Sequence, residues 1–334
     1  MAKKKKISIL DKSTELFKPD KKYSIKAVYP NNLMIEVTNA CNLSCKMCYH
    51  KNMKRKIGFM TENLFTKVID QAVALGIENV GLYTVGEAFL HPKIFDFIKI
   101  AKQKGVKYVY VTTNGNVLNE EEVKKIIDSG LDSIKFSIDA ASKEIYEEVK
   151  TGAKWKKLMG VLMALKKIRN KRKSSLRVFG SFVITDKSFK DLFKYKKVFN
   201  GLVDETLFVF IGNQGGQVEV NSLLPREIKK EMDNLILSKK DWQPCSLLWK
   251  RFVVNYDGKL TICCVDFDAK MVYGDINEST LKECWNNEKM QRFRRIHRGK
   301  KFNILPLCSK CDFVKNNHDM DRRLQAKILK FVNQ

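Results

Sequence analysis

Three cysteines at short spacing, Cys41, Cys45 and Cys48, follow the apolar run of residues 33–37. Thiolates so close in one loop can face a single point, and three of them leave one iron of a cubane iron-sulfur cluster without a protein ligand. A zinc site would normally have a fourth Cys or His in paired knuckles, and although His50 is near, the C-x3-C-x2-C spacing is not that pattern. The loop therefore predicts a cluster with an open iron; a zinc loop and buried free cysteines are the alternatives.

A second set of cysteines stands in the C-terminal third of the chain: Cys245, Cys263, Cys308 and Cys311. Four thiolates can fully coordinate one 4Fe-4S cluster, and a structural zinc ion is the alternative because it also accepts four thiolates. Cys264 directly follows Cys263, on the second strand of an expected hairpin. Because neighbouring side chains on a strand point to opposite faces, only one of these two is expected to reach the cluster.

Six segments with strand patterns alternate with helical patterns through the first two thirds of the chain. The strands are predicted at residues 33–37, 80–83, 108–112, 133–138, 178–184 and 207–211. This alternation predicts an α/β fold whose parallel sheet is curled by right-handed crossovers into a partial (β/α)6, TIM-like barrel. Chemistry in such a barrel lies at the carboxyl ends of the strands, where the first cysteine loop stands. Two helix starts carry cap signals, Asn119 with Glu122 and Ser188 with Asp191.

The pattern changes near residue 238. Residues 252–255 and 260–263 read as two strands, and Asp257-Gly258 between them supplies the backbone that a tight hairpin turn needs. Cys284, in the apolar context of residues 281–285, is predicted to be a helix core residue. We therefore expect an N-terminal arm over residues 1–30, the barrel over 31–237, and a small domain of a β-hairpin and a helix, which binds iron and sulfur, over 238–334.

The loop of Cys41, Cys45 and Cys48 resembles the signature of the radical SAM superfamily. In that family the open iron binds the amino and carboxylate groups of S-adenosylmethionine, and the reduced cluster cleaves it to a 5'-deoxyadenosyl radical. The tetrapeptide of residues 85–88 is similar to the Gly-Gly-Glu-Pro motif that holds the methionyl amino group. It keeps Gly86 and Glu87 and differs at the other two positions. A plain turn is the alternative reading of this tetrapeptide.

Two further strand ends resemble family segments that line the ribose and carboxylate of the cofactor. The resemblance implies cofactor contacts for Asn114, which follows the third strand, and for Ser137 and Asp139, which end the fourth. Capping of the loops is the alternative for these polar residues. Lys150 stands where many relatives have an arginine, and lysine lacks the planar fork of that residue. The glycine-rich loop of residues 211–216 is expected either to approach adenine or substrate or to be only a flexible loop.

The second cysteine set resembles the short SPASM, or twitch, domain of radical SAM enzymes. This implies one auxiliary cluster and therefore two 4Fe-4S clusters, with S-adenosylmethionine as the other cofactor. Counted from Gly258, the family pattern places the ligand at Cys263. Cys264 is then either a core cysteine or, as in some radical SAM epimerases, a thiol that donates a hydrogen atom to the substrate radical.

The resemblance implies abstraction of a hydrogen atom from a C–H bond. A small polar, carbohydrate- or cyclitol-like substrate that is dehydrogenated or epimerised is the favoured expectation, and modification of a peptide or protein is the alternative. A reducing partner such as flavodoxin or ferredoxin is implied. A basic metal-binding protein that binds nucleic acid without catalysis is the alternative from another class, but it would have no use for an open cysteine site beside Gly86 and Glu87.

The charge of the chain is strongly positive. Lys and Arg number 63 against 37 Asp and Glu in 334 residues, a net charge of +26. Such an excess attracts anions, although lysines spread along helices are also ordinary solvated surface. Four arginines, Arg292, Arg294, Arg295 and Arg298, are concentrated enough to predict an anion site. Without a secretion signal or a membrane-length apolar run, and with clustered cysteines, we expect a cytoplasmic protein.

Overall fold

The computed structural model describes residues 23–226, 229, 242–314 and 328. Its helices, 3-10 turns and strands follow one another in this order: β1 (Asn32–Ile35), η2 (Tyr49–Asn52), α1 (Glu62–Ala74), β2 (Asn79–Gly81), η3 (Ala88–Leu90), α2 (Ile94–Gln103), β3 (Tyr108–Thr113), α3 (Glu120–Asp128), β4 (Ser133–Ser137), α4 (Lys143–Val149), α5 (Trp155–Lys171), β5 (Arg177–Ile184), α6 (Asp186–Phe189), α7 (Leu192–Phe199), β6 (Glu205–Phe210), η4 (Asn221–Leu223), α9 (Leu247–Lys250), β7 (Phe252–Val254), β8 (Lys259–Thr261), β9 (Val272–Asp275), α10 (Leu281–Trp285), α11 (Glu288–Arg298) and η6 (Phe302–Ile304). None of the described helices is long and apolar enough to cross a membrane.

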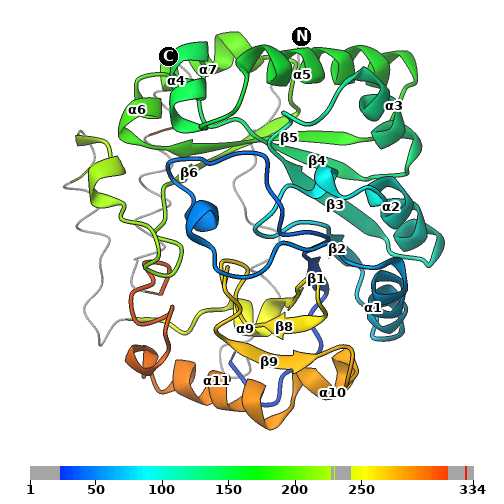
Figure 1. Ribbon diagram of the computed structural model, residues 1–334, viewed down its shortest axis with the longest axis vertical. Coiled ribbons are helices and arrows are strands. Elements are labelled where there is room, and N and C mark those ends of the chain that lie inside the picture. The colour runs from blue at the N-terminus through cyan, green and yellow to red at the C-terminus, as the bar shows by residue number, and fades with distance from the viewer. Residues whose placement is uncertain (1–22, 227–228, 230–241, 315–327, 329–334) are drawn as a thin grey trace, which may run out of the picture.

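A single curved sheet runs through the molecule in the order β6-β5-β4-β3-β2-β1-β7-β8-β9. The strands from β1 to β6 are all parallel, which confirms the predicted α/β barrel. Figure 1 shows the helices α1, α2, α3 and α5 on the outer side of this sheet and the first cysteine loop, in blue, across its concave side. The carboxyl ends of the parallel strands thus meet at the edge where that loop stands.

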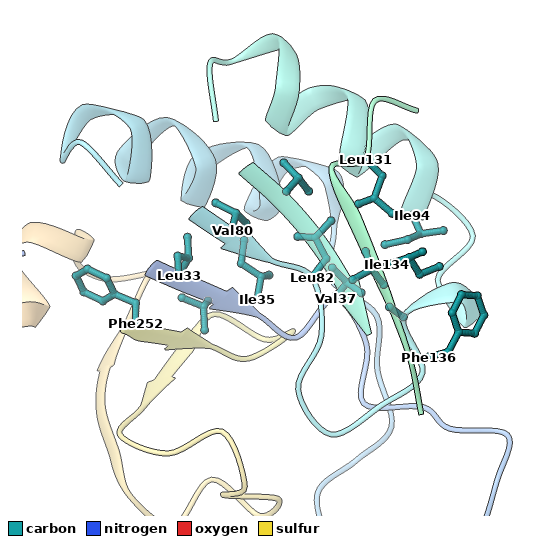
Figure 2. Close-up of a cluster of buried hydrophobic side chains, with 14 of the residues drawn as sticks. Leu33, Ile35, Val37, Val80, Leu82, Ile94, Leu131, Ile134, Phe136 and Phe252 are labelled. Atoms are coloured by element: carbon teal, nitrogen blue, oxygen red, sulfur yellow. The ribbon is translucent and has the colours of Figure 1, made fainter. Parts of the chain in front are cut away.

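Successive side chains on each strand point to opposite faces of the sheet, one toward the helices and one toward the barrel interior. Leu33, Ile35 and Val80 point toward the outer helices together with Ile134 and Phe136, and all of them are fully buried (Figure 2). The residues between them on the same strands face the inside of the barrel, because successive side chains on a strand point to opposite faces. The helices therefore hold the wall of the barrel, and the inward positions are left for chemistry.

The cap signals were half right. Asn119 and Glu122 form the predicted capping box of α3. The second prediction is wrong: Thr185, not Ser188, is the N-cap of α6, and Ser188 closes the capping box from the third helical position. Asp191 precedes α7 without capping it, because its carboxylate accepts hydrogen bonds from the backbone and hydroxyl of residues 141 and 142 instead.

The C-terminal hairpin is present, but it is not separate from the barrel. Strand β7 lies parallel to β1, with Leu33 opposite Phe252, and β8 and β9 continue the same sheet in antiparallel order. An unpaired edge at β1 would expose backbone donors and acceptors, and β7 satisfies them. Residues 23–30, the described part of the predicted arm, also reach this region, where Trp285 donates to the carbonyl of Val28. The predicted boundary at residue 238 lies outside the described residues.

Candidate active site

The first cysteine loop is fixed by backbone pairing with the segment that follows α4. The Ser44 N–H donates to the Thr151 carbonyl and the Lys46 N–H donates to the Val149 carbonyl, both at 3.0 Å. The Cys48 N–H donates back to the Cys45 carbonyl at 3.1 Å. The loop that follows β1 is therefore tied to the loop that follows β4 and α4, on the concave side of the sheet.

The three thiols of this loop are enclosed and influence one another electrostatically. Burial raises the pKa of Cys41 to about 12 and also raises the pKa of Cys45 and Cys48, while the positive charge of Lys150 lowers the last two. In the part of the chain that the structure describes, no three Cys, His, Asp or Glu side chains are close enough together to hold a metal ion. What matches an iron-sulfur cluster is the donor set: three thiols of one loop beside a buried ammonium group that favours their ionised form.

Gly86 and Glu87 join the second strand to this loop. A Cβ atom on Gly86 would lie 2.3 Å from the Thr38 carbonyl oxygen and 2.7 Å from that of Ala40. The protein's own backbone, not a ligand, thus requires the glycine. The Glu87 N–H donates to the Ala40 carbonyl at 2.7 Å, one residue before Cys41.

The Glu87 carboxylate is buried and held by donors from the third strand. It accepts hydrogen bonds from the Thr113 hydroxyl at 2.8 Å and from the Asn114 N–H at 2.7 Å. Burial raises its pKa, and these two hydrogen bonds act in the opposite direction. A carboxylate fixed in this way beside the cysteine loop has the chemistry to accept a further hydrogen bond from an ammonium group.

The other implied cofactor residues stand at the carboxyl ends of β3 and β4. The Asn114 side chain donates to the Asn42 side chain inside the loop at 2.8 Å. The Ser137 hydroxyl is half-buried and has no hydrogen-bond partner among the described residues. Asp139 forms a buried ion pair with Lys150 at 2.7 Å and accepts the Val183 N–H at 2.9 Å. Burial alone would lower the pKa of Lys150, but Asp139 raises it, so the ammonium group stays charged.

The second cysteine set lines one cavity of about 490 Å³, which Met47 of the first loop also lines. Cys245, Cys263, Cys308 and Cys311 all stand on its wall. Burial raises the pKa of Cys245 to about 12 and raises that of Cys308. Four thiols on one cavity wall match the donor set of a fully ligated cluster.

His297 supports this set, although sequence reasoning missed it. Its Nδ1 accepts the Cys245 N–H at 3.2 Å, and burial lowers its pKa to about 4, so the ring is neutral at neutral pH. It lies on α11, whose polar face carries many cations, and no spacing linked it to a cysteine more than fifty residues away. Cys284 is buried on α10, as predicted.

The adjacent cysteines Cys263 and Cys264 are not on a strand, which overturns the premise of the sequence argument. Strand β8 ends at Thr261, and both cysteines lie beyond it, on the wall of the same cavity. A hydrogen bond between the two thiols lowers the pKa of Cys264 and raises that of Cys263. The expectation that they face opposite ways does not apply in this turn. Which of them binds the cluster is still a prediction from the family pattern.

The loop of residues 211–216 links the two cysteine sets. The Gln214 side chain donates to the Met47 carbonyl at 2.9 Å and accepts the Tyr49 N–H at 3.1 Å, on either side of Cys48. The preceding residue, Asn213, accepts the Asp312 N–H at 3.2 Å and donates to the Lys310 carbonyl at 2.7 Å, on either side of Cys311. The loop is a structural bridge, which its composition alone did not indicate.

The predicted arginine anion site is wrong for its central residue. Arg294 is fully buried and stacks over the Trp285 ring at 4.4 Å. Its guanidinium donates to the carbonyls of Ile25, Leu248 and Trp285. Arg295 is exposed and pairs with Glu288 at 2.8 Å. Arg294 therefore takes no part in a surface site, whereas Arg292, Arg295 and Arg298 are exposed on α11.

Comparison with known proteins agrees with this geometry. Residues 35–195 match the radical SAM superfamily, and residues 245–312 match the iron-sulfur cluster-binding domain called SPASM. A relative from Pyrococcus furiosus, named as a tungsten-containing aldehyde ferredoxin oxidoreductase cofactor-modifying protein, is 23% identical over 327 residues, which cover 86% of this chain and 90% of the relative.

Two solved structures have a similar fold. The structure of BtrN in complex with AdoMet and 2-DOIA has a TM-score of 0.56 and 18% identity, and the match covers 85% of this chain and 93% of BtrN. The structure of Streptococcus suis SuiB bound to its precursor peptide SuiA has a TM-score of 0.64 and 13% identity, covering 79% of this chain and 66% of SuiB. At such identities these likenesses concern the fold.

Proposed function

This chain belongs to the radical SAM superfamily and carries a SPASM domain in its C-terminal region, and from that premise we propose its reaction. The chain removes a hydrogen atom from a C–H bond of a small polar, carbohydrate- or cyclitol-like substrate, which ends in dehydrogenation or epimerisation. The observation that carries this proposal is the cavity whose wall includes both Met47 of the first cysteine loop and all four cysteines of the second set.

Cys41, Cys45 and Cys48 would hold one 4Fe-4S cluster, with S-adenosylmethionine on its open iron. Bound there, the pair supplies a 5'-deoxyadenosyl radical when an electron arrives. Gly86 keeps the loop against the second strand, and Glu87 offers its carboxylate to the cofactor ammonium group. Ser137, Asp139 and Asn114 lie at the same edge and are proposed as the remaining cofactor contacts.

The residues of the second set decide what becomes of the substrate after it loses a hydrogen atom. In a dehydrogenation the substrate loses one more electron and a proton, and Cys245, Cys263, Cys308 and Cys311 would hold the cluster that takes the electron. In an epimerisation the substrate regains a hydrogen atom, and the thiol of Cys264 is the candidate donor. The sulfur radical left on Cys264 would return to the thiol by taking one electron from the reductant and one proton. Both outcomes need the substrate to lie in the lumen between the two cysteine sets.

A small substrate is supported by the size of a cavity inside the barrel. This cavity of about 260 Å³ is lined by residues of β1 to β5, among them Tyr110, Lys135 and Phe179. The Pyrococcus furiosus relative is also named for the modification of a cofactor. Modification of a peptide is the second candidate, favoured by the similar fold of SuiB, which was solved with a precursor peptide. We place the reaction in the reducing cytoplasm, with flavodoxin or ferredoxin as the reductant attracted by the net charge of +26.

The test is anaerobic reconstitution with iron and sulfide, followed by reduction in the presence of S-adenosylmethionine. We expect 5'-deoxyadenosine from the wild type and none from Cys48→Ala. The control is Cys284→Ala, which changes a cysteine of the helical core and should keep the activity. A fully iron-loaded wild type that forms no 5'-deoxyadenosine would refute the proposal.

A further inference from the structure

Two cations that face the interior of the barrel have no counter-ion among the residues that the structure describes, and we propose that Lys135 and Arg251 bind an anionic group of the substrate, a carboxylate or a phosphate. This inference rests on the proposed function, because it assumes that the lumen receives the substrate. It names the class of substrate that the lumen accepts, namely one that carries at least one negative charge.

The placement of the two residues follows from the sheet register. Lys135 lies on β4 on the face that turns away from the helices, two residues before Ser137, and opposite Thr112 of β3. Arg251 directly precedes β7, and its guanidinium contacts the Met34 sulfur of β1 at 3.0 Å. Lys135 lines the cavity of about 260 Å³, and Arg251 lines the cavity of the second cysteine set.

Within the described part of the chain, no carboxylate forms an ion pair with either cation. Among the described residues Lys135 has neither an ion pair nor a hydrogen bond, and its ammonium group stands over the Tyr83 ring at 5.4 Å. The Nε of Arg251 is buried without a partner. The inward carboxylate of Glu36 is already held by both terminal nitrogens of Arg55, at 2.7 and 2.6 Å. Burial of unpaired charge is unfavourable and lowers the pKa of Lys135, so an anion that enters the lumen would stabilise the charged form of Lys135 and pair with Arg251.

Neighbouring hydroxyl groups complete the site. Tyr83, Tyr110 and Thr112 line the same cavity as Lys135. The Tyr110 oxygen accepts a hydrogen bond from Asn32 at 2.8 Å, so its own hydrogen is available to donate. Burial raises the pKa of both tyrosines, which keeps them protonated donors. The Thr112 hydroxyl is buried beside the Tyr83 hydroxyl. Oxygen acceptors of a carboxylate or phosphate suit such a set of donors.

Other anions of the holoenzyme are competing explanations. The thiol of Cys264 lines the same cavity as Arg251, but a single thiolate there would leave one of the two positive charges uncompensated. The negative charge of the auxiliary cluster is another candidate, and the carboxylate of S-adenosylmethionine is a third, since Ser137 is only two residues from Lys135. The experiment below gives a different result for each.

Binding of inorganic phosphate and of acetate to the reconstituted holoenzyme is measured by titration calorimetry at low salt, with and without saturating S-adenosylmethionine. We expect one site for at least one probe, and the tighter probe identifies the anionic group. Lys135→Met and Arg251→Met should each weaken binding by about ten-fold or more, the range of a charge-assisted hydrogen bond. Lys99→Met, the same change on the exposed face of α2, should have no effect. Lys135→Arg keeps the charge and should retain most of the affinity, which separates binding from misfolding.

Three results would overturn the inference: no site for either probe in the wild type, equal affinity in wild type and both methionine variants, or loss of the site when S-adenosylmethionine is bound. A variant that moves only the midpoint potential of the auxiliary cluster shows that the cations serve the cluster. The proposed function fails separately, through absence of 5'-deoxyadenosine in the wild type, because formation of that product does not depend on either lumen cation.

Discussion

Gly86→Ala tests the contact that holds the cofactor motif against the cysteine loop. The added methyl group would lie 2.3 Å from the Thr38 oxygen and 2.7 Å from the Ala40 oxygen, and both of these atoms belong to backbone. Overpacking of this kind costs about 1–3 kcal/mol. Separation of the two segments also breaks the hydrogen bond from the Glu87 N–H to Ala40, and a buried donor left without a partner costs about 1–3 kcal/mol.

We therefore expect Gly86→Ala to lower the free energy of unfolding by about 2–5 kcal/mol, since the two costs concern the same contact and are not fully additive. Because Glu87 moves with its neighbour, the KM for S-adenosylmethionine should rise as well. Urea unfolding, followed by tryptophan fluorescence, gives the first quantity, and 5'-deoxyadenosine formation gives the second.

The matched control is Gly160→Ala in the middle of α5, where no atom lies within 4 Å of the new Cβ. Alanine favours a helix over glycine, so this variant should be more stable by about 0.5–1 kcal/mol and fully active. If Gly86→Ala unfolds at the wild-type urea concentration and keeps the wild-type KM, the close approach of residue 86 to the loop is not what positions Glu87.

Four further outcomes are expected. Alanine at Cys41, Cys45 or Cys48 should remove about half of the iron by the cubane stoichiometry and leave the second cluster in place; loss of all iron, measured by colorimetric assay, would contradict independent sites. Gln214→Ala removes both hydrogen bonds to the first cysteine loop and should destabilise that loop by about 1–3 kcal/mol, seen as faster iron release to a chelator, with exposed Lys99→Ala as the control. If Cys264 donates hydrogen, Cys264→Ser should cleave the cofactor without forming an epimerised product. The wild type in deuterated water should then form a product that carries deuterium on carbon. Normal turnover by the mutant would mean that Cys264 is a structural cysteine. Burial lowers the pKa of His91, so the neutral ring contributes stability above the pKa of an unfolded histidine, and this contribution is lost as the pH falls below that value. The free energy of unfolding should therefore decrease less between pH 7 and pH 5 in His91→Gln than in the wild type. An equal decrease in both proteins would contradict this.

The fold was predictable because its signals are local. Short apolar segments that alternate with helical patterns marked the parallel strands, and the capping box of Asn119 and Glu122 marked the start of a helix. Residues whose roles depend on contacts distant in sequence were not predictable. His297 reaches Cys245 across 52 positions, and Gln214 reaches Met47 across 167. The docking of β7 against β1 belongs to the same class, because each strand alone is only a short apolar run.

The site was predicted where spacing carries the chemistry and was mistaken where backbone geometry decides. The spacing of the three cysteines in one loop is enough to predict a cluster. The prediction that Cys263 and Cys264 lie on a strand is wrong, because that strand ends at Thr261. Likewise, a helical repeat of arginines gave no sign that Arg294 would be turned inward. Lys135 could not be predicted as a site residue, because the sequence around a lysine that faces the barrel interior is the same as that around a lysine exposed on a strand.

The direction of the hairpin explains how the two cysteine sets could act on one substrate from opposite sides. Strand β1 runs to the carboxyl edge of the barrel, where the loop of Cys41 follows it. Strand β8 is antiparallel to β7, with Val254 opposite Leu260, so the chain beyond Thr261 runs back toward the start of β7, where Arg251 stands. Cys264 and Arg251 line the same cavity. We propose that a substrate held by these cations loses hydrogen toward the first loop; if Cys264 then returns a hydrogen atom from the other side, the carbon is inverted.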